Sequence, residues 1–352
     1  MVKKVYKIVL GLILALVMLF LLFLGWQTIT EFKPPDRQAI NVGNNSTPVD
    51  DTLSLVTWNI GYFGLGAEMD FFYEGGKMVR PERDLYSKYL NEGLARIRSF
   101  SNSDFIMLQE IDTSSHRTYN DNQFRKVREL MPEFHSFYAS NYNAWVPVPL
   151  KKPMGKVNAG IVTLSKTEPI EAKRVSFHSS YSWPMRLFQL KRCFLELRFN
   201  TKDGKQLIIV NTHNSAFEDA SSMREQELAM LKNLMEEEYS KGNYLIIGGD
   251  WNQNPAPYDT NAVLDDYKAG VITPGIPEDF LPEGWQYAYD SLHTTNRYVK
   301  TPYIEGKTGS TLIDFFVVSP NIEVLKVETT PTHFKESDHQ PVRLKVRLKA
   351  KG

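Results

Sequence analysis

The chain has 352 residues, of which 42% are hydrophobic, 12% aromatic and 23% charged, with 41 basic and 41 acidic side chains and one cysteine. This composition is typical of a folded globular protein and excludes collagen-like repeats, coiled-coil rods and long disordered tracts. A single thiol forms no internal disulfide and no thiolate metal cage, so disulfide-rich scaffolds and zinc fingers are excluded as well.

The N-terminal segment is the first distinct element. Lys3, Lys4 and Lys7 precede an apolar run over residues 8–26, which is 19 residues without a charge. A helix of that length is long enough to cross the hydrocarbon core of a bilayer. The lysines favour a cytoplasmic N-terminus over residues 1–7, by the positive-inside tendency. The sequence therefore predicts a single-pass anchor that places the rest of the chain outside the cytoplasmic membrane.

A cleaved signal peptide is the alternative interpretation of this segment. Signal peptides usually have a shorter apolar region that ends at small residues, whereas this run leads into Gly25, Trp26 and Gln27. We favour the uncleaved anchor, and cleavage would give a secreted form. Residues 27–50 are polar and punctuated by proline, glycine and asparagine, which indicates a linker to a domain over residues 51–352.

The charge balance of that domain bears on its partners. Residues 1–32 hold three lysines and one glutamate, so the remainder has two more acidic than basic side chains. Such a domain has no overall positive field, which weakens but leaves open a role on long nucleic acid.

Eight segments of the domain are rich in β-branched and aromatic residues, which predicts strands. They are 53–59, 105–109, 159–164, 193–199, 206–212, 244–248, 313–318 and 342–348. Helices are expected over 82–100, 122–131 and 222–241, the last with Ser222 and Glu225 at the spacing of a capping box. This pattern predicts two packed sheets flanked by helices. Residues 265–310 are expected to form long loops.

Residues of the types that bind metals or transfer protons stand at the ends of several predicted strands, or just before a strand begins. Three of these residues, Asn59, Glu110 and Asp338, offer hard oxygen donors. Such donors suit Mg²⁺ or Mn²⁺ and match soft metals poorly. Mg²⁺ held by few protein ligands keeps open positions for phosphate oxygens and neutralises charge in phosphoryl transfer.

The remaining polar residues suit proton transfer and phosphate positioning. His339, if it is paired with Asp314, is oriented to remove a proton from an attacking water. Asp250, Asn252 and His213 would then line the opposite side of the phosphorus and position its oxygens.

Taken in order, these motifs resemble the endonuclease/exonuclease/phosphatase superfamily, also called the deoxyribonuclease-I-like fold. The resemblance spans about residues 53–348. It rests on Trp58-Asn59, Gln109-Glu110, Thr212-His213, Gly249-Asp250-Trp251-Asn252, Ile313-Asp314 and Ser337-Asp338-His339. It implies a four-layer α/β sandwich of two packed mixed sheets flanked by helices, and Mg²⁺-dependent hydrolysis of phosphoester bonds.

The resemblance also implies roles for individual residues. Glu110 corresponds to the principal metal ligand, with Asn59 and Asp338 near the metal. His339 corresponds to the general base, and Asp314 to the residue that orients it.

Five further positions complete the candidate site. Asp250 and Asn252 correspond to the residues that position the nucleophile and phosphate. His213 matches the second histidine of the nuclease and sphingomyelinase branches, which the abasic-site endonuclease branch lacks. Asn158 and Arg117 lie on segments that could reach a substrate phosphate, although a turn and a solvated surface explain them equally well.

The sequence thus predicts a membrane-tethered, Mg²⁺-dependent phosphodiesterase or nuclease. A sphingomyelinase-like or other phospholipid or small-molecule phosphodiesterase, a phosphatase, and a non-catalytic anchored scaffold of the same fold are the alternatives. The expected partners are a phosphoester substrate and the membrane, and no protein partner is inferred.

Overall fold

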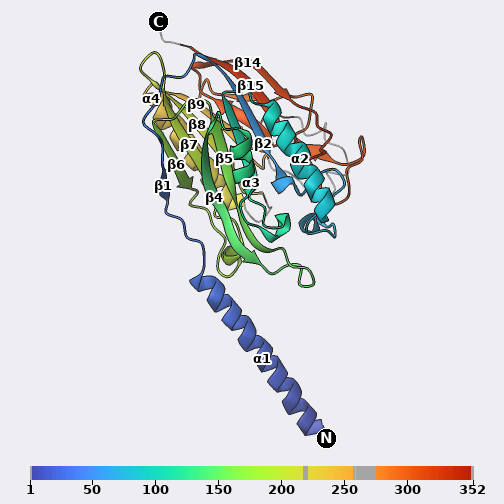
Figure 1. Ribbon diagram of the computed structural model, residues 1–352. Helices are drawn as coiled ribbons and strands as arrows, with labels where there is room; N and C mark the ends of the chain where they lie inside the picture. Colours follow the sequence, from blue (N-terminus) through green and yellow to red (C-terminus); the bar gives the residue numbers. More distant parts are fainter. Residues whose placement is uncertain (1, 217–220, 257, 259–274, 350–352) are drawn as a thin grey trace.

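The computed structural model describes residues 2–216, 221–256, 258 and 275–349, and shows two packed β-sheets with helices on both outer faces (Figure 1). Each sheet contains both parallel and antiparallel pairs. The four-layer α/β sandwich expected from the sequence is therefore confirmed. A long N-terminal helix projects away from this body.

One sheet has seven strands, and only its β8–β9 pair is parallel among the described strands. Its order across the sheet is β1 (Arg37–Ile40), β6 (Glu171–Ser176), β7 (Cys193–Asn200), β8 (Gln206–His213), β9 (Tyr244–Asp250), β13 (Asp314–Val318) and β10 (Gln286–Ala288).

The other sheet has six strands, with a parallel β2–β3 pair at its centre. Its order is β14 (Ile322–Thr329), β15 (Val342–Leu348), β2 (Thr52–Asn59), β3 (Phe105–Asp112), β5 (Gly155–Ser165) and β4 (His135–Val146). A separate ribbon pairs β11 (Asn296–Arg297) with β12 (Ser310–Thr311).

Large apolar clusters hold the layers together. Strand β2 buries side chains on both of its faces: Leu55 enters the core between the sheets, while Val56 faces the opposite, helix-covered side. Helices α2 (Arg83–Ser99) and α3 (Gln123–Leu130) cover that outer side. Helix α4 (Ser221–Ser240) covers the outer face of the seven-stranded sheet.

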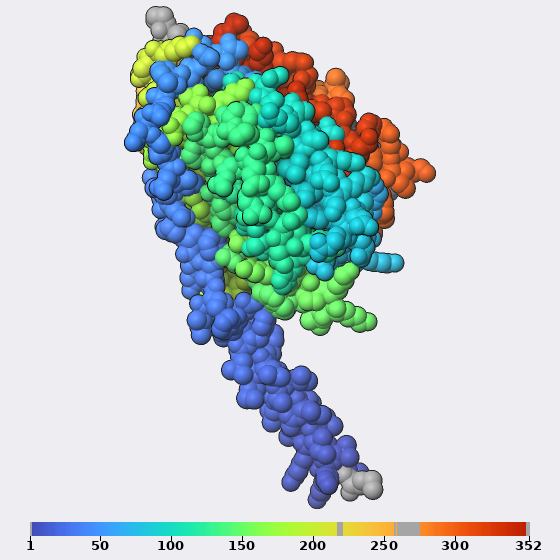
Figure 2. All heavy atoms as spheres, viewed as in Figure 1, coloured from blue at the N-terminus to red at the C-terminus, as the bar shows by residue number. Residues whose placement is uncertain are grey.

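Helix α1 (Val2–Ile29) extends beyond the predicted apolar run at both ends. It is long and apolar enough to cross a membrane, and nearly all of its side chains are exposed (Figure 2). An N-terminal signal sequence has the same properties, so the helix by itself is compatible with either interpretation.

All eight predicted strands and three predicted helices are present, with small shifts at their ends. Helix α4 begins at Ser221, so Ser222 lies in its first turn and is not the N-cap that the capping-box spacing suggested. Of the stretch expected as loops, residues 265–274 lie outside the described residues, and the rest contains only the short strands β10 to β12.

The sequence pattern missed β1, β4, β6 and β14. Strand β1 lies inside the stretch expected as a linker, where it pairs with β6 from Arg37↔Val175 to Ile40↔Ala172. Strands β1, β4 and β14 stand at sheet edges, where one side needs no apolar covering, so they carry more polar residues than central strands.

Candidate active site

The predicted site residues come from the same end of both sheets. The polar ends of the parallel strands β2 and β3 lie side by side, with Asn59 opposite Gln109. In the other sheet, Asp250 is opposite both His213 and Asp314. The amide Nδ2 of Asn59 donates to Oδ2 of Asp250 over 2.9 Å and so joins the two sheets directly.

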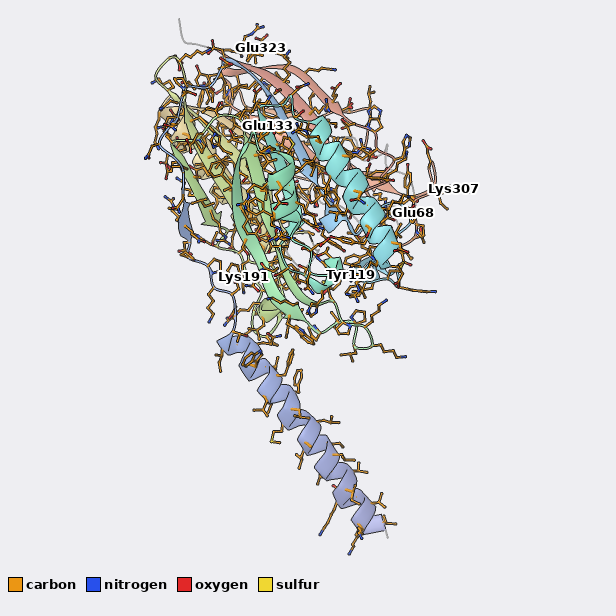
Figure 3. The ribbon with its side chains drawn as sticks, viewed as in Figure 1. Glu68, Tyr119, Glu133, Lys191, Lys307 and Glu323 are labelled. Carbon is orange, nitrogen blue, oxygen red and sulfur yellow. The ribbon has the colours of Figure 1, made fainter. Side chains whose placement is uncertain are left out.

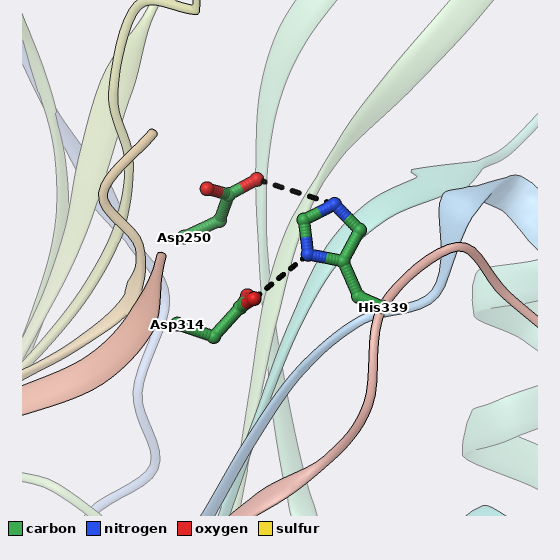
Figure 4. A group of neighbouring side chains, drawn as sticks. All are labelled: Asp250, Asp314 and His339. Atoms are coloured by element: carbon green, nitrogen blue, oxygen red, sulfur yellow. Dashed lines mark hydrogen bonds and ion pairs between the residues drawn. The ribbon is translucent and has the colours of Figure 1, made fainter. Parts of the chain in front are cut away.

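His339 lies between two carboxylates at this junction (Figure 4). Its Nδ1 is 2.8 Å from Oδ2 of Asp314, and its Nε2 is 3.8 Å from Oδ2 of Asp250. All three residues are buried. With Nδ1 donating to Asp314, Nε2 carries the lone pair that a general base needs.

The electrostatics of this group favour a bound proton. Burial by itself would lower the pKa of His339, but the charges of Asp314 and Asp250 outweigh it and raise that pKa well above the usual value. Burial raises the pKa of Asp250 to about 6, although the charge of His339 opposes the rise. The carboxylates of Asp314 and Asp250 thus stabilise the protonated imidazole of His339. This is the form that a histidine base has after it has taken a proton.

Glu110 and His213 continue the line of polar groups. Nε2 of His213 lies 3.4 Å from Oδ2 of Asp250 and 3.8 Å from Oε1 of Glu110. Burial, with the nearby positive charges of Arg192 and His339, lowers the pKa of His213 well below its usual value. His213 is therefore a neutral hydrogen-bonding group at neutral pH.

A bulge in β3 directs Glu110 toward this group. The β3–β5 register shifts between Leu108 and Ile111, and Glu110 has a φ of 58°. Such a bulge re-aims one side chain at the edge of a site. The Glu110 side chain consequently keeps 27% exposure, while Gln109 is fully buried.

The turn after β2 lies against Ser337 and Asp338. Ser337 Oγ donates to the carbonyl oxygen of Asn59 over 2.8 Å, and the Gly61 amide donates to Asn59 Oδ1 over 3.0 Å. A Cβ atom on Gly61 would lie 2.5 Å from Oδ1 of Asp338, and Gly61 has a φ of 48°. Only glycine fits this position without displacing the Asp338 carboxylate.

This donor set fits a hard divalent cation. Burial raises the pKa of Asp338 and the negative charge of Glu110 adds to the rise, although the positive charges of His339 and Arg297 oppose it. A bound cation would offset the repulsion between the two carboxylates. Asp250, Asp314 and His339 also offer ligand atoms within 4.8 Å of one another. The residues present therefore fit the cation expected from the sequence.

Asn252 belongs to the same group of residues, whereas Asn158 and Arg117 have other partners. The Asn252 backbone amide donates to Oδ1 of Asp250 over 2.9 Å. Asn158 bonds to serines of the loop after β3, with its backbone amide 2.9 Å from Ser115 Oγ. Arg117 is buried and forms two bonds to Asp112, of 2.9 and 3.1 Å.

Asn296 is a site residue that the sequence did not indicate. Its Nδ2 lies 3.0 Å from Nε2 of His339, the nitrogen proposed to receive the proton. Asn296 stands on the two-residue strand β11, inside a stretch without periodicity, so no sequence signal points to it.

A small pocket lies between the segment over residues 179–192, the start of the loop after β8 and the start of α4. Arg192 lines it and donates from Nη1 to the His213 carbonyl oxygen over 3.3 Å. Serines line much of the rest, including Ser179 and Ser215.

Fold and site together define a metal-dependent hydrolase of phosphoric esters. The model of the Endonuclease/Exonuclease/phosphatase family matches residues 56–339, and the chain belongs to that family. The family expected from the sequence and its class of enzyme are thereby confirmed. No curated protein matches the sequence.

Solved structures show the same fold. The chain is 16% identical to an endonuclease/exonuclease/phosphatase from Beutenbergia cavernae DSM 12333, with a TM-score of 0.54 over 85% of this chain and 72% of that one. It is 14% identical to humanized D. rerio TDP2, with a TM-score of 0.53 over 85% of this chain and all of the other. The human Nocturnin catalytic domain, with bound sulfate, is 18% identical and has a TM-score of 0.52 over 90% of this chain and all of the other.

Proposed function

We propose that the protein is a Mg²⁺-dependent phosphodiesterase that acts outside the cytoplasmic membrane, with His339 as its general base. The observation that carries the proposal is the buried pair of His339 with Asp314 at 2.8 Å, placed next to the line of Asp250, His213 and Glu110. The proposed mechanism needs a base, a carboxylate that orients it and oxygen ligands for a cation, and the proximity of these residues at one end of the sandwich supports it.

The cation would be held by Glu110 and Asp338, with Asn59 close by, and Mn²⁺ is an alternative to Mg²⁺. A bound cation would supply positive charge to the phosphate oxygens. The carboxylate of Glu110 is the most exposed of the three donors, so it reaches the open side of the site.

The chain's own residues would perform the proton transfer. Nε2 of His339 accepts the proton of the attacking water, while Asp314 keeps Nδ1 protonated and stabilises the imidazolium that forms. Asn252 and Asp250 position the nucleophile and the phosphate. Neutral His213 donates a hydrogen bond to a phosphate or leaving-group oxygen.

Two substrate classes fit this site. A structure of D. rerio TDP2 contains a single-strand DNA product, which supports nucleic acid as a substrate of this fold. The slightly acidic domain fits a long polyanion poorly. A phospholipid or small phosphodiester is the second candidate, because the site lies at the end of the sandwich from which α1 emerges. Asn158 and Arg117 stay candidate phosphate contacts of lower priority.

Helix α1 is proposed as a single-pass anchor with residues 1–7 in the cytoplasm. The three lysines before the apolar run support that orientation. A reporter fused after Gly352 should lie outside the cytoplasm, and a mature N-terminus near Gln27 would instead show a cleaved signal peptide.

The activity is tested with the full chain, purified and supplied with Mg²⁺ or EDTA. Plasmid DNA, RNA, bis-p-nitrophenyl phosphate and sphingomyelin are the substrates. We expect Mg²⁺-dependent hydrolysis of at least one, and loss of it in His339→Ala. His293→Ala is the matched control, because His293 also pairs with an aspartate, Asp290, at 2.9 Å but on the surface. Full activity of His339→Ala would refute the assignment of the base.

A further inference from the structure

The open end of the site and the end of α1 lie on the same side of the molecule. In the seven-stranded sheet, Ser176 at the end of β6 is opposite Cys193, and Phe194 is opposite Thr212. The β6–β7 connection, residues 177–192, therefore lies at the same sheet end as His213. Strand β1 enters from that end too, since Arg37 pairs with Val175.

The β4–β5 hairpin projects beyond the site on the same side. Gly160 of β5 is opposite both Ile111, next to Glu110, and Ser140 of β4. From that level the paired strands continue to Val146↔Gly155 before they turn. The tip over residues 147–154 consequently extends past the metal-binding end of β3.

Helix α1 is packed against both of these projections. The ring of Phe23 lies 5.7 Å from that of Trp145 and stacks at 6.0 Å on that of Phe188. Nε1 of Trp183 donates to Thr28 Oγ1 over 3.2 Å. These contacts fix the direction of α1 relative to the hairpin tip and the β6–β7 connection.

The same projections expose apolar side chains. Leu150, at the hairpin tip, is 87% exposed, and Trp183 and Met185 of the β6–β7 connection are about half exposed. Single exposed apolar residues are ordinary, but these lie on the two projections against which α1 packs, and α1 is itself apolar and exposed, with Trp26 at 66%. We call Trp145 to Lys152 and Tyr181 to Phe188 the membrane-proximal surface.

Basic side chains accompany the apolar ones. Lys151 and Lys152 follow Leu150 directly, and Lys156 is the second residue of β5; all three are exposed. The only acidic partner described for this trio is Glu82, 3.8 Å from Lys152, and both side chains of that pair are well exposed. Aromatic, aliphatic and lysine side chains together are typical of a surface in the headgroup region of an anionic bilayer.

We propose that the membrane-proximal surface docks on the anionic headgroup region of the membrane that α1 spans, and so holds the open end of the active site toward the bilayer. The inference rests on the proposed anchor. The domain then does not swing freely on a linker: β1, the contacts of Phe23 and the inserted Leu150 tip set one orientation.

The test uses the full chain in bilayers that contain phosphatidylglycerol and a nitroxide-labelled lipid, with a fluorescent dye on single thiols. Cys193 is buried and stays unlabelled, so Leu150→Cys and Trp183→Cys report the proposed surface. Glu323→Cys is the control, since Glu323 lies at the opposite end of the body from Lys191 and α1 (Figure 3). We expect the lipid nitroxide to quench the first two dyes and not the third.

Three results would overturn the docking: no quenching at any position, equal quenching at all three, or a chain that is not retained with the bilayers. As a second variant, Lys151→Glu with Lys152→Glu should weaken quenching at a Trp183→Cys dye in anionic bilayers, and unchanged quenching would count against the charge contribution. Hydrolysis of soluble bis-p-nitrophenyl phosphate is measured in the same samples. Absent quenching with intact hydrolysis removes the docking alone, whereas quenching without hydrolysis removes only the proposed function.

Discussion

The substitution Asp314→Asn tests the chemistry of the site with the least disturbance of its shape. Oδ2 of Asp314 lies 2.8 Å from Nδ1 of His339, and both residues are buried. Two unit charges at that distance attract by about 6 kcal/mol at an effective dielectric constant of about 20. This attraction exists only once His339 is protonated, so it stabilises the state that follows proton transfer.

The loss of transition-state stabilisation in Asp314→Asn should be smaller than the full attraction of about 6 kcal/mol, because the asparagine oxygen still accepts a hydrogen bond from Nδ1 of His339. Base catalysis contributes about 10²- to 10⁴-fold, or about 3 to 5 kcal/mol of activation free energy, so kcat should fall within that range. The carboxylate of Asp314 raises the pKa of His339. Its removal should lower that pKa, and the acid limb of the kcat/KM profile should move to lower pH while the plateau drops.

The assay is hydrolysis of bis-p-nitrophenyl phosphate by the full chain with saturating Mg²⁺, followed across pH. Asp290→Asn is the matched control, because Asp290 Oδ2 also lies 2.9 Å from a histidine Nδ1, that of exposed His293. In this control, the plateau and the acid limb of the pH profile of kcat/KM should both stay as in the wild type. An Asp314→Asn enzyme with an unchanged plateau and an unmoved acid limb would refute the reasoning.

Three further outcomes are expected. Glu110→Gln should abolish or strongly weaken the activation of hydrolysis by Mg²⁺ when the metal is titrated into the enzyme, and EDTA should abolish hydrolysis by the wild type. An activation curve unchanged by the substitution would place the metal elsewhere. Burial by itself would raise the pKa of Glu238, but hydrogen bonds from Arg198, Lys241 and Asn243 hold that pKa at about 2. Glu238→Gln should therefore lower the free energy of unfolding by about 1.5–3 kcal/mol near neutral pH. Because that pKa is depressed, this stabilisation is present above the usual glutamate pKa and disappears as the pH falls toward 2, where denaturation midpoints of the two proteins should converge. Gly93→Ala should lower the melting temperature, because the new Cβ would lie 2.1 Å from the buried ring of Phe63. This steric cost is expected to exceed the helix preference of alanine over glycine, about 1 kcal/mol. A higher melting temperature would contradict the prediction.

The sequence alone determined the central elements of this protein. Central strands such as β2 and β9 bury side chains on both faces, and that requirement is visible in the sequence as short segments rich in apolar and β-branched residues. The polar residues that end these segments, among them Asn59 and Asp250, stand out for the same reason. Their order along the chain was enough to indicate the family, since the fold preserves that order.

Only the tertiary structure decided how these residues meet. The bond from Asn59 to Asp250 crosses from one sheet to the other, and the contact of Asn296 with His339 joins residues 43 apart through a two-residue strand. Sequence patterns record the local periodicity of burial, whereas such contacts depend on how sheets stack and where loops return. The same limit hid the membrane-proximal surface, because exposed Leu150 acquires its meaning only from the helix packed beside its hairpin.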